Sequence, residues 1–249
     1  MSISHMTCSS GRLPVSLVNL VLKSPIAPSL SVEPGTIEHS RKSMDFFGKI
    51  MPVARGVKIQ SISYGGVPCQ QHQPRKAPSN RVLLYFHGGG YCVGSPLSHR
   101  HLIARLAKQS KMRAVAPDYR KAPEHTHPAP IEDAVNVYSA LLEEGVKPEN
   151  IYLAGDSAGG NLVLATLIRL RDLSIALPAA ACCISPWTDL SMSGETIASK
   201  GHVDLLLTPE LLRQFASHYS AGVSAEQHGN SSAMSPLAAD LTGLPPLLI

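Results

Sequence analysis

The chain has 249 residues, of which 44% are hydrophobic and 16% are charged, and its formal net charge is +4. This length and apolar content suit one globular domain with a modest appendage and exclude a disordered chain. The 22 basic and 18 acidic residues form no run of like charge. We therefore expect neither a nucleic acid nor an anionic membrane surface as a partner.

Cysteines and apolar stretches bear on the cellular compartment. Residues 13–22 form the one apolar stretch near the N-terminus, and they are too few to span a bilayer. We expect no signal peptide and no membrane span. The odd set of cysteines lacks the spacing of a metal site or a disulfide framework, which favours free thiols in the cytoplasm. These cysteines are Cys8, Cys69, Cys92, Cys182 and Cys183.

The first part of the chain is predicted to be an arm followed by a helix. Residues 1–35 are rich in Ser and Pro and lack sustained periodicity. Apolar residues then recur at helical intervals over residues 36–50, and Pro52 ends the run. We assign residues 1–52 to an N-terminal arm and cap helix. Residues 57–64 alternate as a strand does, and a Gly-Gly turn leads into a second extended segment.

From residue 81 onward, predicted strands and helices alternate. This order implies right-handed crossovers and a mainly parallel sheet with helices on both faces, a core that we assign to residues 53–190. Reactive groups in such sheets gather at the carboxyl ends of the strands. The predicted strands cover residues 81–86, 112–116, 151–154 and 179–184, and the predicted helices cover 99–108, 130–142 and 161–170.

A Ser- and Gly-rich stretch then interrupts the alternation. Residues 191–230 contain one helical run, residues 209–219, and are predicted to form a cap insertion over the sheet. Residues 231–249 are predicted to return to the core. The segment from Leu244 to Ile249 resembles a strand that has just begun, so we expect further strands and helices of the fold beyond Ile249.

A G-x-S-x-G pentapeptide follows the predicted strand at 151–154. At a tight strand-to-helix turn a serine hydroxyl projects above the sheet, and small neighbours avoid clashes with the crowded backbone. Ser157 is therefore predicted to be a nucleophile rather than a helix N-cap, the ordinary structural role of a serine at this position. Its neighbour Asp156 is expected to make structural hydrogen bonds.

A second motif, His-Gly-Gly-Gly at residues 87–90, follows the predicted strand at 81–86. Consecutive glycines let backbone amides approach a ligand and donate to a developing oxyanion. His87 could serve as a general base, but its place before the glycines favours a role in holding their loop.

Together these motifs resemble the hormone-sensitive-lipase-like family of esterases. The resemblance also runs through the sequences PDYRKAPEHTHPAPIEDA, SPWTDLS and MSPLAADLTGLPPLLI. It implies an α/β-hydrolase fold with a cap, and hydrolysis of short-to-medium acyl esters without a cofactor. It also implies that Ser157 is the nucleophile and that the amides of Gly88, Gly89 and Ala158 form the oxyanion hole.

The chain departs from the family's pattern at its end. The triad acid and histidine of that family follow a segment like LPPLLI, so we expect both beyond Ile249, and this chain to be a fragment. Asp204 with His218 or His228 satisfies the chain order of a triad, but these residues lie in the presumed cap. A non-catalytic small-molecule receptor of the same fold is the alternative function.

For several other side chains the sequence leaves the role undecided or favours a structural one. Tyr91 and Trp187 could line an acyl pocket or simply pack in the core. No metal site is expected, because the His pairs at 99 and 101 and at 125 and 127 lack partners at metal-ligand spacing. A homodimer stays open. The charged residues after the strand at 112–116 are expected to fix loop geometry, and they are Asp118, Arg120, Glu124 and Asp133.

Overall fold

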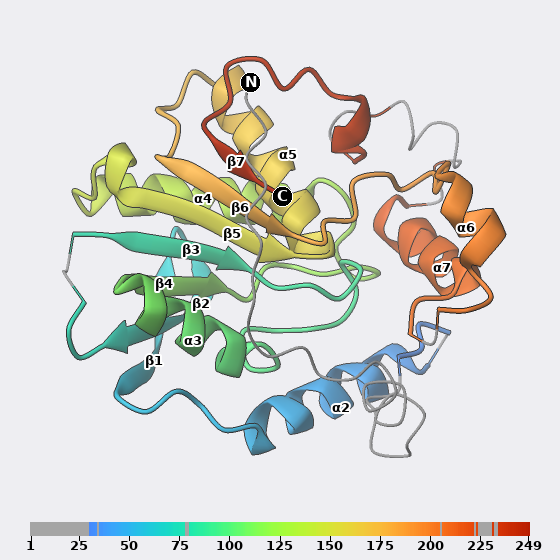
Figure 1. Ribbon diagram of the computed structural model, residues 1–249, viewed down its shortest axis with the longest axis horizontal. Coiled ribbons are helices and arrows are strands. Elements are labelled where there is room, and N and C mark those ends of the chain that lie inside the picture. The colour runs from blue at the N-terminus through green and yellow to red at the C-terminus, as the bar shows by residue number, and fades with distance from the viewer. Residues whose placement is uncertain are drawn as a thin grey trace.

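One seven-stranded sheet organises the molecule (Figure 1). Its strands lie in the order β1-β2-β4-β3-β5-β6-β7. They are β1 (Val57–Tyr64), β2 (Val67–Pro74), β3 (Val82–Phe86), β4 (Arg113–Pro117), β5 (Ile151–Asp156), β6 (Ala180–Ile184) and β7 (Leu247–Leu248). The computed structural model describes residues 30–33, 35–77, 80–204, 206–221, 223, 231 and 234–249.

The sheet has an antiparallel edge and a parallel centre. β1 and β2 pair as a hairpin across Gly65 and Gly66, which both have positive φ, and β2 pairs antiparallel with β4. All remaining neighbours are parallel. The predicted mainly parallel sheet is therefore confirmed. Its parallel strands all end at one edge, where reactive groups were expected.

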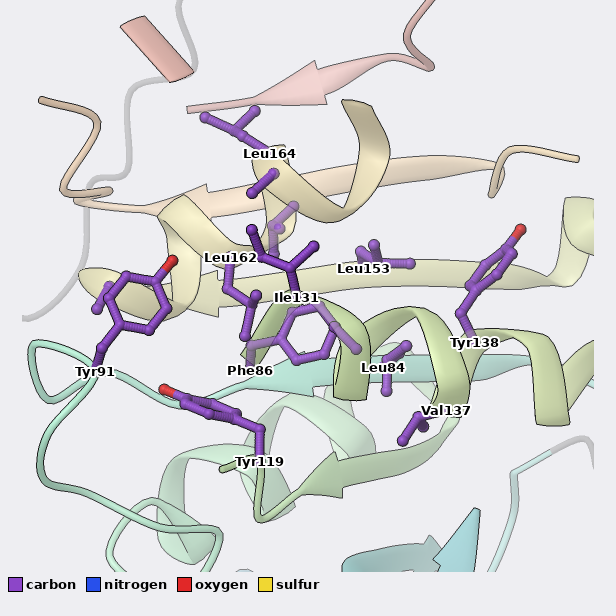
Figure 2. Close-up of a cluster of buried hydrophobic side chains, with 14 of the residues drawn as sticks. Leu84, Phe86, Tyr91, Tyr119, Ile131, Val137, Tyr138, Leu153, Leu162 and Leu164 are labelled. Atoms are coloured by element: carbon purple, nitrogen blue, oxygen red, sulfur yellow. The ribbon is translucent and has the colours of Figure 1, made fainter. Parts of the chain in front are cut away.

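Both faces of the sheet are buried, which explains the unbroken apolar run of β3. Val82, Leu84 and Phe86 point to one face and belong to the main core, part of which Figure 2 shows. Leu83 and Tyr85 point to the other face and pack in a smaller cluster. Because successive strand residues alternate between faces, a strand covered on both sides is apolar at every position.

Three helices cover the sheet at the predicted places. α4 (Ala129–Glu143) and α5 (Ala158–Asp172) contribute side chains to the main core, and α3 (Arg100–Ser110) contributes to the smaller cluster. α3 ends at Lys111, whose left-handed conformation stops the helix. The predicted α/β arrangement with helices on both faces is confirmed.

In the described part of the chain three further α-helices lie off the sheet, and Figure 1 shows α6 and α7 beyond the carboxyl ends of β3 and β5. α2 (Ile37–Ile50) and α7 (Pro209–Tyr219) agree with the prediction. α7 begins at a proline, and the Thr208 hydroxyl accepts from Leu211 N at 3.2 Å as its N-cap. α6 (Glu195–Lys200) was not predicted, because six residues are too few to show a helical period.

Two predictions about the whole chain can be compared with this fold. Cys69, Cys92, Cys182 and Cys183 are free thiols, as expected, and Cys8 lies outside the described residues. Among the residues placed in the structure, no helix combines the length and the apolar character that crossing a membrane requires.

Candidate active site

Ser157 occupies a strained turn between β5 and α5. Its φ of 53° and ψ of −121° are rare for a residue with a side chain, and such a conformation costs about 1–3 kcal/mol. The surroundings hold it there: Ser157 N donates to Ile184 O at 3.0 Å, and Trp187 N donates to Ser157 O at 3.0 Å. The serine itself is half-buried. A strained backbone that is held by hydrogen bonds, with a partly exposed serine side chain, is the arrangement expected of a nucleophile at such a turn.

Glycines let the Ser157 turn touch the loop that follows β3. A Cβ added at Gly159 would lie 2.1 Å from the carbonyl oxygen of Phe86 and 2.6 Å from that of His87. A Cβ at Gly155 would lie 2.4 Å from the Gly159 oxygen. Any side chain at these two positions would therefore separate the two segments. The G-x-S-x-G and His-Gly-Gly-Gly motifs meet in space, as predicted from parallel neighbouring strands.

The glycine loop presents backbone donors beside this turn. Gly89 and Gly90 have φ of +121° and +58°, conformations that a side chain would strain. Within the described part of the chain, the amides of Gly89, Gly90 and Ala158 donate to no other group. Unpaired amides at a crowded turn and at the start of a helix are suited to an anion.

The Gly88 amide has a different role from the predicted one. Its N–H donates to Asp156 Oδ1 at 3.0 Å, so it is not available to an oxyanion. Its assignment to the oxyanion hole is therefore wrong, because a carboxylate on the neighbouring strand already satisfies it. Gly90, which was not assigned from the sequence, offers the free amide instead.

His87 holds the glycine loop. Its Nδ1 donates to Gly88 O at 2.8 Å, and its ring stacks on Tyr119 with centroids 4.3 Å apart. Burial lowers the pKa of His87 well below its usual value, so the ring is neutral. Nε2 is enclosed without a partner among the described residues. These contacts favour loop holding over the general-base alternative.

The two aromatic candidates for the acyl pocket differ. Tyr91 is fully buried, donates to Asn161 Oδ1 at 2.8 Å and stacks on Tyr219. These contacts favour the alternative in which Tyr91 packs in the core. Trp187 is half-buried and bonded through its backbone to Ser157. Its indole Nε1 has no partner among the described residues. Trp187 is thus the better placed of the two to contact an acyl group.

Asn161 is a site residue that the sequence analysis did not single out. It is fully buried in an apolar stretch of α5, and its Nδ2 donates to Trp187 O at 2.7 Å and to Met234 O at 2.9 Å. One amide side chain therefore joins the loop after β6 to the segment before β7. The signal was present, since a buried Asn inside an apolar helix requires partners.

Asp204 and His218 do not form the alternative catalytic pair. Asp204 Oδ1 accepts from the amides of Leu206 and Leu207, and His218 Nε2 lies 2.8 Å from Val32 O. These two side chains are engaged with different groups. His228 lies outside the described residues.

Charged residues near the site fix loops, as expected. Arg120 bonds Asp133, and Arg41 bonds Glu124. Lys121 is paired with Asp118. Within the described ranges, no group of three or more His, Cys, Asp or Glu side chains could hold a metal ion.

Two elements cover the site. A Cβ at Gly90 would lie 2.4 Å from the ring of Phe215 on α7. Gln214 Nε2, also on α7, donates to Glu33 Oε1 at 2.6 Å. The segment before α2 and helix α7 therefore contact each other, and α7 lies against the glycine loop.

A polar cavity of about 570 Å³ is an unrelated feature. Arg113 and Glu144 line it, and Arg113 begins β4. The cavity therefore opens at the amino ends of the parallel strands, away from Ser157.

Comparison with known proteins identifies relatives of this chain. Residues 83–249 match a family described as having the alpha/beta hydrolase fold. The chain is 41% identical over 218 residues to an acetyl-hydrolase of Streptomyces hygroscopicus, across 88% of this chain and 70% of that protein. An esterase structure from the bacterial hormone-sensitive lipase family superposes with a TM-score of 0.79 and 38% identity, covering 87% of this chain and 72% of its own. A hormone-sensitive lipase from a metagenome library gives a TM-score of 0.86 at 33% identity, covering 96% and 78%.

Proposed function

This chain belongs to the alpha/beta hydrolase fold family, in its hormone-sensitive-lipase-like branch, and from this premise we propose that it is a carboxylic ester hydrolase that uses Ser157 as nucleophile. The observation that carries the proposal is the contact between the Ser157 turn and the glycine loop, which places a strained serine beside free backbone amides. Relatives named acetyl-hydrolase and esterase support the same chemistry.

The reaction proceeds through an acyl-enzyme. Ser157 Oγ attacks the carbonyl carbon of the ester, and its proton passes to a general base. The tetrahedral intermediate then collapses, the bond to the alcohol oxygen breaks, and the alcohol leaves with that proton. Water attacks the acyl-enzyme in the same way and releases the carboxylic acid and free Ser157.

Backbone amides stabilise the intermediate. We assign the oxyanion hole to Gly89, Gly90 and Ala158, whose N–H groups are free among the described residues. Ala158 also begins α5, where the aligned peptide dipoles favour negative charge. Preorganised donors of this kind are typically worth about 10²–10³ in turnover each.

The triad acid and base are proposed to lie beyond Ile249. Asp204 and His218 are engaged elsewhere, and His87 is enclosed and neutral. The chain spans 70% of the Streptomyces acetyl-hydrolase and 78% of the metagenomic lipase, which leaves room for both residues in a longer protein.

The acyl pocket is proposed to form under a cap. We propose that residues 1–52 supply an N-terminal arm and cap helix, residues 53–190 the hydrolase core, residues 191–230 the cap insertion, and residues 231–249 the return to the core. Phe215 beside Gly90 and the half-buried Trp187 are the proposed walls. A small-molecule ester of short-to-medium acyl length is the proposed substrate. Cytoplasmic location and a homodimer stay predictions from the sequence.

The test uses the protein encoded by the complete reading frame that contains this chain. It should hydrolyse p-nitrophenyl acetate or butyrate, and Ser157→Ala should lose about 10⁴–10⁶ in turnover. Ser174→Ala is the matched control, because Ser174 also has positive φ, at 56°, but is exposed and outside the site. Retained turnover in Ser157→Ala would refute the ester hydrolase. A wild type without turnover and without fluorophosphonate labelling at Ser157 would favour the receptor alternative.

A further inference from the structure

The carboxylate of Asp156 joins the nucleophile turn to the glycine loop. Its Oδ1 accepts from Gly88 N at 3.0 Å and from the hydroxyl of Tyr85 at 2.7 Å. Its Oδ2 lies 3.5 Å from His99 Nε2. The side chain is 24% exposed, and it lies between Tyr85 on β3 and His99, the residue that precedes α3. Two hydrogen bonds to one oxygen and an imidazole beside the other hold this carboxylate in one orientation.

The fit between this carboxylate and the loop is close. A Cβ added at Gly88 would lie 2.3 Å from Asp156 Oδ2 and 3.0 Å from the backbone oxygen of the same residue. Position 88 therefore has no room for a side chain while Asp156 keeps its place. The hydrogen bond from Gly88 N fixes the peptide between His87 and Gly88, and so the direction in which the loop enters Gly89 and Gly90.

We propose that Asp156 is a positioning residue for ester hydrolysis, and that its carboxylate holds the Gly88 amide so that the amides of Gly89 and Gly90 face the developing oxyanion. The inference rests on the proposed function. In the proposed reaction Asp156 contacts neither the substrate nor the reacting atoms. Asp156 acts through Gly88. The Gly88 N–H donates to the carboxylate, so it cannot also stabilise the intermediate.

The negative charge of Asp156 is compensated where it lies. An anion one residue from Ser157 would oppose a second anion on the substrate. Burial raises the pKa of Asp156, but the hydrogen bond and charge of His99 and the hydrogen bond from Tyr85 outweigh burial, and the pKa of Asp156 is lowered overall. The carboxylate is thus ionised and fully engaged, with its charge directed toward donors rather than toward the acyl group.

The test compares two variants of the complete protein with p-nitrophenyl acetate. Asp156→Ala removes the acceptor, and kcat should fall about 30- to 300-fold while KM changes less than about threefold, because donors aimed at the oxyanion act in the transition state. Asp156→Asn keeps one acceptor oxygen for Gly88, and it should restore at least about a tenth of the wild-type kcat. Asp172→Ala, which removes an exposed carboxylate paired with Arg171, is the matched control.

A second measurement separates positioning from folding. A boronic acid that forms a tetrahedral adduct with Ser157 should bind to Asp156→Ala more weakly by about the factor lost in kcat/KM. Gly88→Ala should itself lower activity. The double variant Gly88→Ala/Asp156→Ala should lose much less activity than the two single losses combined, because both changes remove the same contact.

Each result decides between the two hypotheses. Turnover in Asp156→Ala within threefold of wild type, boronate affinity unchanged, or additive losses in the double variant would overturn the inference. If Ser157→Ala is inactive in that same set, the proposed function still stands. If Ser157→Ala keeps its turnover, the ester hydrolase itself fails.

Discussion

The rings of Tyr91 and Tyr219 stack with centroids 3.9 Å apart and 5° between their planes. Tyr91 directly follows the glycine loop and Tyr219 ends α7, and both rings are fully buried. Tyr91 also donates to Asn161 on α5 at 2.8 Å. The position of α7 over the site is thus connected, through two rings and one hydrogen bond, to the helix that begins beside Ser157.

Removing one ring should loosen α7. Tyr219→Ala is expected to destabilise the protein by about 3–5 kcal/mol, the usual cost of deleting a buried aromatic side chain. KM for p-nitrophenyl butyrate should rise more than kcat falls, because α7 belongs to the proposed cap over the acyl pocket and not to the proposed oxyanion hole. Urea unfolding and steady-state kinetics measure the two effects.

Tyr219→Phe is the control for the stacking itself. It keeps the ring and removes only the hydroxyl that lies 3.2 Å from His127 Nδ1, so it should cost no more than about 1.5 kcal/mol. Equal losses in the Phe and Ala variants would show that the hydroxyl, and not the stacked ring, holds α7.

Local patterns predicted most of the fold. The unbroken apolar run of β3 and the glycines around Ser157 reflect constraints within a few residues, a strand buried on both faces and a tight turn, so they are readable from the chain. The hydrogen bond from Gly88 to Asp156 is different. It joins residues 68 positions apart through a side chain, and no local period encodes it. The sequence therefore could not show that the Gly88 amide, which we had assigned to an oxyanion hole, is already bonded to a carboxylate.

Contacts between distant segments around the site were not predicted, for the same reason. Phe215 lies against Gly90, and Asn161 joins two loops, only because tertiary packing brings distant segments together. Short α6 has too few residues for a period. A local motif marks the strained turn at Ser157, but no local pattern predicts which distant neighbours hold that turn in place.

A methyl group in the glycine loop should be incompatible with activity. Gly90 has φ of +58°, and a Cβ there would lie 2.4 Å from the Phe215 ring. Gly90→Ala is expected to lower kcat/KM by at least about 100-fold, because one amide of the proposed oxyanion hole is displaced. Gly66→Ala is the control, since Gly66 has φ of +80° with nothing within 4 Å of an added Cβ. It should cost only about 1–2 kcal/mol of stability. Comparable kinetic losses in both variants would exclude a specific role for Gly90.

Arg41 should anchor α2 to the loops beside the site. Its guanidinium donates to Cys92 O and Ala122 O at 2.8 Å each and pairs with both oxygens of Glu124. A lysine cannot reproduce this fork, so Arg41→Lys is expected to destabilise the protein by about 1–2 kcal/mol. Glu124 is half exposed, which limits the contribution of the charge pair. Thermal unfolding measures the loss.

The same anchor predicts a dependence on pH. The hydrogen bond from Arg41 lowers the pKa of Glu124 from 4.5 to about 2. A carboxylate with a lowered pKa stabilises the fold above pH 4.5, and this contribution is lost as the pH falls toward 2. The stability difference between wild type and Arg41→Lys should therefore shrink over that range. Lys42→Ala, which removes only an exposed pair with Glu38, should show no such change.

His72 should make the protein sensitive to mild acid. It is fully buried on β2, and neither ring nitrogen has a partner within the described ranges. Burial first, and then the charge of Arg100, lower its pKa from 6.5 to about 4. The His72 imidazole is therefore protonated near pH 6.5 in the unfolded chain but only near pH 4 in the folded chain. The free energy of unfolding falls as the pH falls between these values. At pH 5 the loss should be about 2 kcal/mol.

A leucine at position 72 removes both unpaired nitrogens. His72→Leu should be more stable than wild type, and its advantage should grow by about 2 kcal/mol between pH 7.5 and pH 5. His87 is also buried and also contributes to acid sensitivity, but it is present in both proteins, so the difference between them isolates His72. His39→Gln, on the exposed side of α2, is the control and should leave the pH dependence unchanged. Urea unfolding at the two pH values measures the difference. An advantage of equal size at both would mean that His72 does not titrate between them.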